Sequence, residues 1–248
     1  MKNILVIICT TFMFTSCEKA SDGTGTANAG TSVGKGGSLA RFTIVGDYLY
    51  AVDNSTLNVY DIHDPVTTKI VNSVVLRFGV ETIYPYKDKL FIGSRDGMYI
   101  YSIATPSSPS LLGEARHTRS CDPVVANDSV AFVSLMGNQR CGPAEDGIYT
   151  YNIKNVLTPV QIHLNRIPTP NGIGLQDSIL YVCQKTNGMS IYNVNDPAAP
   201  VLRNKITGKT FEDVICYDNI LVCYISTGLA LYDVSVPSSP VELSLVNN

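Results

Sequence analysis

The phrase Gly97-Met98-Tyr99-Ile100-Tyr101-Ser102-Ile103-Ala104-Thr105-Pro106-Ser107-Ser108-Pro109 decides the fold, because the chain contains five versions of it. Each version has a short apolar run, then Tyr followed by a polar residue, then a turn that contains Pro. The other four begin at Leu57, Ile148, Met189 and Leu229. The phrase is therefore a repeat unit, and repeats of about 40 residues are typical of solenoids and propellers.

Each copy also contains an Asp between two apolar runs, namely Asp47, Asp88, Asp128, Asp177 and Asp218. Asp favours tight turns because its side chain can bond backbone N–H groups nearby, so each unit predicts a β-hairpin. The expected first strands are 42–45, 83–86, 124–126, 172–175 and 213–216, and the second strands are 49–52, 90–93, 130–133, 179–182 and 220–223. A second turn follows at pairs such as Asp96-Gly97 and Asn187-Gly188, in which Gly supplies the positive φ of a two-residue turn.

The Tyr-containing phrase then forms a third strand, and a short apolar run after the Pro-rich turn forms a fourth. Four antiparallel strands in about 40 residues correspond to one propeller blade. The sequence therefore predicts an all-β fold, a five-bladed β-propeller of four-stranded antiparallel blades, with repeats of about 40 residues at 39–76, 77–116, 117–167, 168–207 and 208–248. The five blades either close into a ring without exchanging strands or form an open arc that a partner completes.

The N-terminus resembles a lipoprotein signal peptide of residues 1–16. Lys2 precedes an apolar run at 4–14, and Phe14-Thr15-Ser16-Cys17 resembles a bacterial lipobox. That resemblance implies that Cys17 becomes the first mature residue and carries acyl chains such as palmitate, which anchor the protein to a membrane. An ordinary signal peptide with an incidental Cys is the alternative. Residues 17–38 are rich in Ser, Gly, Thr and Ala, which predicts a flexible tether.

Three phrases, 49–52, 57–65 and 232–240, resemble the LVIVD-repeat family of bacterial secreted and surface proteins, which are β-propellers. The similarity extends from Phe42 to Val246. It implies a propeller in the bacterial envelope and no particular activity, because the family shares no catalytic residues. Glu18 and Asp22 resemble the acidic residues that follow the acylated Cys in surface lipoproteins of Bacteroidetes. Tyr before the Asp or Asn, and an insertion in the third repeat, depart from the family pattern.

Composition excludes several classes of function. With a formal net charge of −3 and no basic stripe, the chain is not expected to bind nucleic acid. Its 3 His stand at no metal-ligand spacing, and no hydrolase or zinc-protease motif occurs. We therefore expect no metal, no cofactor and no catalytic residue.

Polar residues occupy the start of every innermost strand: Arg41, Thr82, Asp122, Asn171 and Glu212. In a propeller these starts lie on the same face as the connections between second and third strands, where ligands usually bind. The residues predict a polar ring at the channel mouth that binds a small polar ligand or ion, unless they are polar only because strand ends meet water. Strand alternation would direct Asp213 away from the channel if Glu212 points into it.

The third repeat contains a longer loop at 136–146, which includes Arg140 and Cys141. Topology brings this loop to the same face as Cys121. In an oxidising compartment we expect a Cys121–Cys141 disulfide, worth about 3 kcal/mol. A stapled loop favours binding because less entropy is lost when it engages a ligand. The remaining strand cysteines, Cys183, Cys216 and Cys223, are expected to be small unpaired hydrophobes.

These features predict an outer-membrane lipoprotein of the bacterial envelope, on either side of that membrane. Its propeller is expected to be a non-catalytic scaffold with a protein or glycan partner on the loop face. One alternative is a carbohydrate-active hydrolase that uses Asp122 and Glu212, although the chain contains no Trp for a sugar platform. Another is a structural subunit of an outer-membrane assembly.

Overall fold

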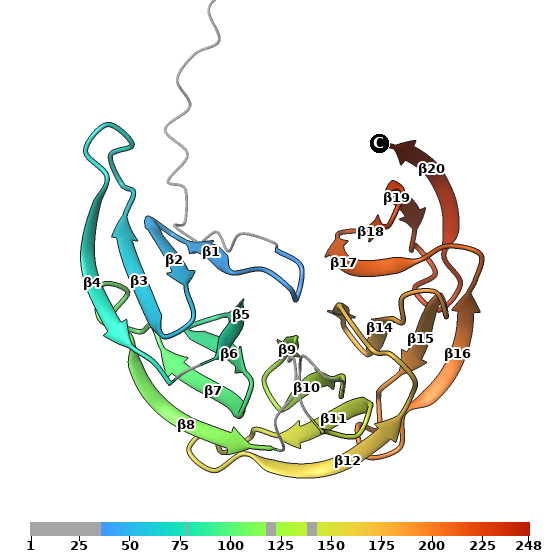
Figure 1. The fold of residues 1–248 in the computed structure, drawn as a ribbon, viewed down its shortest axis with the longest axis horizontal. Helices are drawn as coiled ribbons and strands as arrows, with labels where there is room; N and C mark the ends of the chain where they lie inside the picture. Colours follow the sequence, from blue (N-terminus) through green and yellow to red (C-terminus); the bar gives the residue numbers. More distant parts are fainter. Residues whose placement is uncertain (1–35, 78, 118–122, 138–142) are drawn as a thin grey trace, which may run out of the picture. The chain divides into compact units, whose positions relative to one another are not determined.

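The computed structural model describes residues 36–77, 79–117, 123–137 and 143–248. These residues form five separate antiparallel sheets, each of four strands paired in sequence order (Figure 1). Each sheet is one blade, and its first strand lies innermost. The predicted five-bladed β-propeller is confirmed. Within the described ranges no helix is long and apolar enough to cross a membrane.

The strands have the following bounds. Blade 1 contains β1 Phe42–Val45, β2 Tyr48–Val52, β3 Thr56–Asp61 and β4 Lys69–Val75. Blade 2 contains β5 Val80–Tyr86, β6 Lys89–Ser94, β7 Gly97–Ser102 and β8 Ser110–Arg116. Blade 3 contains β9 Val124–Ala126, β10 Val130–Leu135, β11 Gly147–Asn152 and β12 Val160–Arg166. Blade 4 contains β13 Ile173–Gln176, β14 Ile179–Cys183, β15 Met189–Asn193 and β16 Val201–Ile206. Blade 5 contains β17 Phe211–Tyr217, β18 Ile220–Ile225, β19 Gly228–Asp233 and β20 Val241–Asn247.

The polar residue after Tyr in the repeat begins the Pro-rich turn. Asp61 Oδ1 accepts the N–H of His63 at 3.0 Å, and Asn193 Oδ1 accepts the N–H of Asn195 at 3.0 Å. Blades 3 and 5 make the same bond. A short side chain that bonds backbone two residues later ends the strand and starts a turn. This bond explains why Asp or Asn recurs in the repeat.

The Gly of the second turn has two different roles. Gly188 and Gly228 have positive φ values of 90° and 140°, as predicted. Gly97 and Gly147 do not, so the prediction is wrong in blades 2 and 3. There a Cβ on Gly97 would lie only 2.6 Å from the carbonyl oxygen of Ala115. The outer strand of the blade approaches too closely for any side chain.

The core lies between adjacent blades. On the second strand of blades 1 to 4, one fully buried aromatic residue faces the next blade: Tyr50, Phe91, Phe132 and Tyr181. The Tyr50 hydroxyl donates to the carbonyl of Pro106 at 2.8 Å, and Tyr181 makes the same bond to Pro237. In blades 1 and 4, a large apolar ring with a satisfied hydroxyl therefore joins the blade to the Pro-rich turn of its neighbour.

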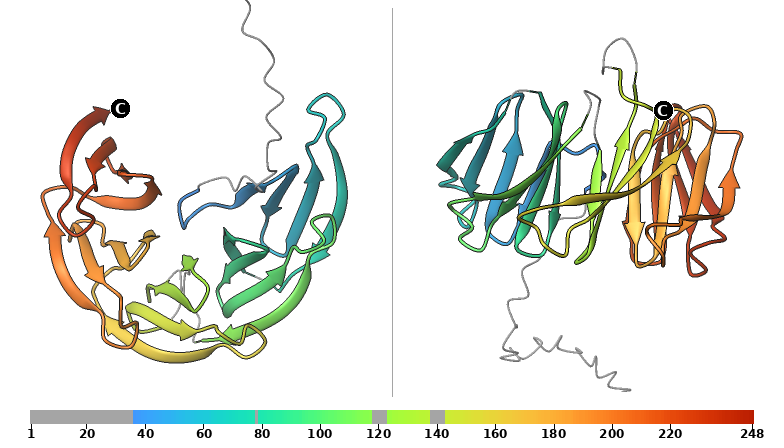
Figure 2. Two further views of the ribbon diagram at one scale, coloured as in Figure 1. Left: turned by 180° about the vertical axis from the view of Figure 1, so that it is seen from behind. Right: turned by 90° about the horizontal axis from the view of Figure 1, so that it is seen from below.

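The blades follow one another along an arc, with their strands running between two faces (Figures 1 and 2). Strand β1 packs against β5, β5 against β9, β9 against β13, and β13 against β17. In the described part of the chain, β17 makes no comparable packing with β1. We call the face where the innermost strands begin the mouth face. It also carries the β2–β3, β6–β7, β14–β15 and β18–β19 connections.

Candidate functional site

A cavity of about 240 Å³ opens at the mouth face, and we call it the mouth cavity. Its lining residues are Leu39, Arg41, Glu81, Thr82, Pro123, Met136, Pro170 and Asn171. Three of the five predicted ring residues, from blades 1, 2 and 4, therefore surround one cavity. It is slightly smaller than a typical drug-sized pocket, which suits a small ligand or one protruding group of a larger partner. The predicted Asp122 precedes Pro123 and lies outside the described residues.

The fourth ring residue, Glu212, is fixed by two partners. Asn171 Nδ2 donates to both the carbonyl oxygen and Oε2 of Glu212 at 2.9 Å, and Lys185 Nζ lies 3.0 Å from the same Oε2. On the other side of the mouth, Arg95 Nε lies 2.8 Å from Glu81 Oε1. Both carboxylates are therefore neutralised by a cation and held in one orientation.

Arg41 supplies positive charge at the mouth. Its Nη2 donates to the carbonyl of Val80 at 3.4 Å, a long bond, and the side chain is exposed. Within the described ranges no carboxylate forms an ion pair with Arg41. A guanidinium is planar and can bind a carboxylate or phosphate through two parallel hydrogen bonds. Among the described residues, the mouth cavity therefore offers a guanidinium without an ion-pair partner, together with Glu81, whose charge is paired by Arg95.

Residues 36–39, which we call the axial segment, connect blade 1 to blades 4 and 5. The buried Ser38 hydroxyl accepts the backbone N–H of Ile173 at 2.7 Å and donates to Asp213 Oδ1 at 3.2 Å. The backbone N–H of Leu39 donates to Asp213 Oδ2 at 3.2 Å. The start of the fold is therefore tied to β13 and β17 by hydrogen bonds.

Asp213 makes a contact that the alternation of strand residues does not predict. A bulge between Phe211 and Asp213 interrupts the alternation of β17, so that Asp213 meets the axial segment. Burial raises the pKa of this carboxyl from 3.8 to about 6, although hydrogen bonds from Val214, Leu39 and Ser38 oppose the rise. Sequence reasoning missed the contact because a bulge leaves no clear signal and Ser38 is 175 residues away.

Gly172 is expected to tolerate no side chain, because β17 lies directly against it. A Cβ at this position would lie 2.2 Å from Asp213 Oδ1 and 2.6 Å from the carbonyl oxygen of Glu212. Gly172→Ala should lower the free energy of unfolding by about 1 to 3 kcal/mol, as overpacking does. Urea denaturation measures the change. Gly36→Ala is the matched control, since its Cβ would meet only Ala40 at 3.3 Å, and equal stability of the two variants would contradict the prediction.

A second cavity of about 380 Å³, the channel cavity, lies among the innermost strands of blades 2 to 5. Gly36 and Ser38 line this cavity, whereas Leu39 lines the mouth cavity, so the axial segment borders both. Gln176 Nε2 donates to the carbonyl of Asp218 at 2.8 Å, which fixes its amide orientation and leaves Oε1 buried without a hydrogen bond. Burial also raises the pKa of Tyr84, which lines the same cavity, to about 12.

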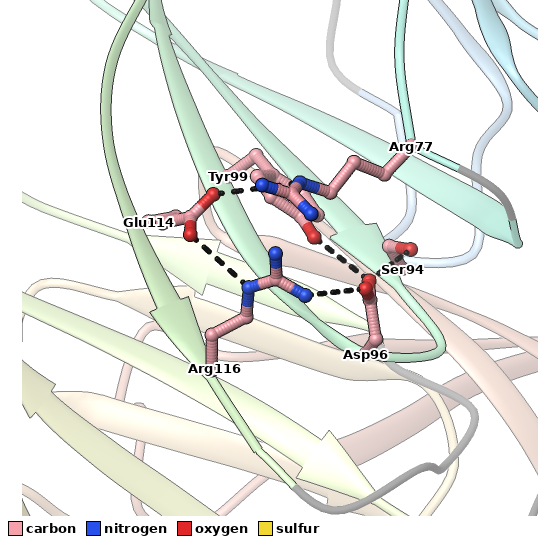
Figure 3. A network of polar contacts seen from close by, with 6 residues as sticks. All are labelled: Arg77, Ser94, Asp96, Tyr99, Glu114 and Arg116. Carbon is pink, nitrogen blue, oxygen red and sulfur yellow. Dashed lines mark hydrogen bonds and ion pairs between the residues drawn. The ribbon is translucent and has the colours of Figure 1, made fainter.

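A polar network on blade 2 holds the rim of the mouth face (Figure 3). Asp96 accepts hydrogen bonds from the Tyr99 hydroxyl at 2.8 Å and from Arg116 Nη1 at 2.6 Å. Glu114 forms two ion pairs: its Oε1 lies 3.1 Å from Arg116 Nε, and its Oε2 lies 3.8 Å from Arg77 Nε. Asp96, in the β6–β7 turn, is therefore bonded to Arg116 of the outer strand β8, which fixes the turn against that strand. These side chains are structural, because their charges are already paired.

The other predicted site residues, Cys17, Cys121, Arg140 and Cys141, lie outside the described residues. Within the described ranges, Cys183, Cys216 and Cys223 form no disulfide. In the β17–β18 register Cys216 stands opposite Leu221, and Cys223 stands opposite Val214. Among the described residues, no group of His, Cys, Asp or Glu is arranged to hold a metal ion.

Comparison with known proteins identifies the fold and no family. No protein-family model matches the chain, and no curated protein matches its sequence. A protein from Lactobacillus plantarum is similar over 82% of this chain and 72% of its own, with a TM-score of 0.65 and 14% identity. The periplasmic gluconolactonase PpgL of Pseudomonas aeruginosa matches 82% of this chain and 68% of its own, with a TM-score of 0.62 and 12% identity.

BamB from Moraxella catarrhalis is similar over 75% of this chain and 55% of its own, with a TM-score of 0.57 and 10% identity. At identities this low, the likeness extends to the propeller architecture alone. Substrate and partner must therefore be argued from the site.

Proposed function

We propose that the chain is a non-catalytic binding module that recognises an anionic group of a ligand or partner in its mouth cavity. One observation carries this proposal: Arg41, Thr82 and Asn171 come from three blades and line one cavity. Glu81 in its lining and Glu212, which is bonded to Asn171, already have cationic partners. Paired carboxylates are poor proton-transfer groups, so this arrangement favours binding over hydrolysis. Arg41 forms no ion pair within the described residues, which leaves its guanidinium available to the ligand.

Ligand binding at Arg41 should be visible as thermal stabilisation. At about 100 times Kd, a ligand that binds only the folded state stabilises it by about 2.7 kcal/mol. We expect a panel of carboxylated sugars and short acidic peptides to contain members that raise the Tm, and Arg41→Ala to abolish the rise. Arg203→Ala, an exposed arginine on outer strand β16, is the control. A rise that survives Arg41→Ala would place binding elsewhere.

We further propose that the repeats are of the LVIVD type and that the module is held at the bacterial outer membrane by acylation of Cys17. The support is the sequence of residues 1–38, in which an apolar run, a lipobox-like cleavage site and a polar tether follow one another. A protein or glycan partner on the mouth face would then be met a short distance from the membrane.

The anchor gives a direct prediction. Cys17→Ala should move the protein from the membrane fraction to the soluble envelope fraction, because the acyl chains are lost. Intact-mass analysis of the natural protein should show the added acyl chains at its N-terminus. Cys9→Ala, within the segment expected to be removed, is the control. A Cys17→Ala protein that remains in membranes would contradict the proposed anchor.

A further inference from the structure

At the two ends of the blade series, apolar blade faces are not covered by any of the described residues. We call the face that packs on the preceding blade the incoming face, and the face that packs on the following blade the outgoing face. Four interfaces within the molecule join an outgoing face to an incoming face, each with its own buried cluster. The incoming face of blade 1 and the outgoing face of blade 5 are the two that remain.

The incoming face of blade 1 is exposed at positions that are buried in every other blade. Phe42 pairs with Ala51 in the β1–β2 hairpin and is 65% exposed. The residues in the same hairpin position of blades 2 to 5 are Ile83 at 1%, Val124 at 0%, Ile173 at 0% and Val214 at 1%. Ile44, on the same face, is 40% exposed. A whole blade covers this position elsewhere in the molecule, and nothing described covers it here.

The outgoing face of blade 5 shows the same contrast. Tyr224 on β18 is 53% exposed, whereas its counterparts Val52 and Cys183 are 6% and 0% exposed. Leu229, which pairs with Tyr224, is 40% exposed. Its counterparts on the third strands of blades 1 and 4, Leu57 and Met189, are fully buried. Contiguous apolar residues of this kind usually mark an interaction site.

Both uncovered faces border one opening in the arc, between β1–β4 and β17–β20 (Figures 1 and 2). We propose that this opening receives a β-sheet of a partner protein, with apolar residues alternating on both of its faces, as a sixth blade in trans. The contact repeats a type of interface that the molecule already makes four times. It lies apart from the mouth cavity and does not depend on the function proposed for that cavity.

Two other occupants fit less well. The part of the predicted tether that precedes the axial segment, residues 17–35, is mainly Ser, Gly, Thr and Ala, so it has too little apolar surface to cover two blade faces. A second copy whose blade 1 packed on blade 5, as successive blades pack on one another, would extend the circular arrangement of the blades. Because the five blades already follow more than half of a circle in Figure 1, that copy would collide with blade 1. A single sheet is the occupant that satisfies both faces.

Hydroxyl-radical footprinting of Phe42 and Tyr224 tests the proposal. In the purified mature protein both should be oxidised readily, and the buried Tyr181 should not. A chain extended after Asn248 by a second copy of residues 77–116 supplies a defined sixth blade. In that chain, oxidation of Phe42 and Tyr224 should fall to the level of Tyr181. An otherwise identical extension with Leu90→Glu and Phe91→Glu in the added copy disrupts one residue of each blade face and should restore oxidation.

The same footprint in intact cells that produce the natural protein shows whether a partner is present. Loss of oxidation at both Phe42 and Tyr224 in cells, with the exposed Leu157 unchanged, is the expected result. Equal oxidation in cells and in the purified protein would overturn the proposal, as would an added blade that protects neither residue. Protection in a purified monomer would show that the ring closes on itself, and protection in a purified dimer would identify a second copy. Either result would also overturn it.

Discussion

Tyr181→Ala is expected to lower the free energy of unfolding by about 3 to 5 kcal/mol, the cost of removing a large buried aromatic ring. The ring is fully buried between blades 4 and 5, and its hydroxyl bonds the carbonyl of Pro237. Removal would leave a cavity at the blade interface and an unsatisfied carbonyl in the Pro-rich turn. Urea or thermal denaturation of the purified mature protein measures the loss.

Two comparison variants separate packing from the hydrogen bond. Tyr181→Phe removes only the hydroxyl and should cost about 1 to 2 kcal/mol. Tyr224→Ala removes a half-exposed ring at the uncovered end of the series and should change stability by less than about 1 kcal/mol. Equal losses for Tyr181→Ala and Tyr224→Ala would show that the face bearing Tyr224 is covered within the isolated protein.

Asp213 should make folding stability depend on pH in an unusual direction. Burial raises its folded-state pKa to about 6 from 3.8, so between these values the folded protein holds a proton that the unfolded chain has lost. The contribution of Asp213 to stability is therefore greatest below about pH 4, and it declines as the pH rises to about 6. At about 1.4 kcal/mol per pH unit over this interval, the total approaches about 3 kcal/mol.

Asp213→Asn removes this titration, because Asn stays neutral. Its one carbonyl oxygen can accept the bonds that Ser38 and Val214 donate to Oδ1, whereas its amide nitrogen replaces Oδ2, which accepts from Leu39. The lost bond lowers stability equally at every pH, so the stability of the variant relative to wild type should rise by about 3 kcal/mol between pH 4 and pH 7. Urea denaturation at several pH values measures the difference between the two curves, in which titrations shared by both proteins cancel. Asp64→Asn, at an exposed turn with an ordinary lowered pKa, is the control. Parallel curves for Asp213→Asn and wild type would contradict the burial argument.

The blades could be predicted from the sequence because their signals are local. An Asp between two apolar runs marks one hairpin, and the polar residue after Tyr marks the next turn through a bond to backbone two residues away. The Gly of Asp96-Gly97 was predicted for the wrong reason. Its role depends on the approach of Ala115 from the outer strand, which cannot be inferred from a turn signal.

The site could be predicted only in part. Counting back from each turn places Arg41, Thr82 and Asn171 at strand starts, and the structure gathers them around one cavity. The role of Asp213 could not be predicted, since it depends on a bulge and on a serine far away in sequence. The uncovered faces at Phe42 and Tyr224 were equally hidden. Apolar alternation indicates that a face is buried and does not indicate what covers it.

Site-specific photo-crosslinking in the producing organism tests most directly whether the mouth face is the binding surface. A benzophenone amino acid would replace Leu39, which lines the mouth cavity, or Val66, which is 89% exposed in a turn on the opposite face. We expect a discrete crosslinked product from position 39 and none from position 66. No product from position 39, or the same product from both positions, would contradict the proposal that the propeller binds through its mouth.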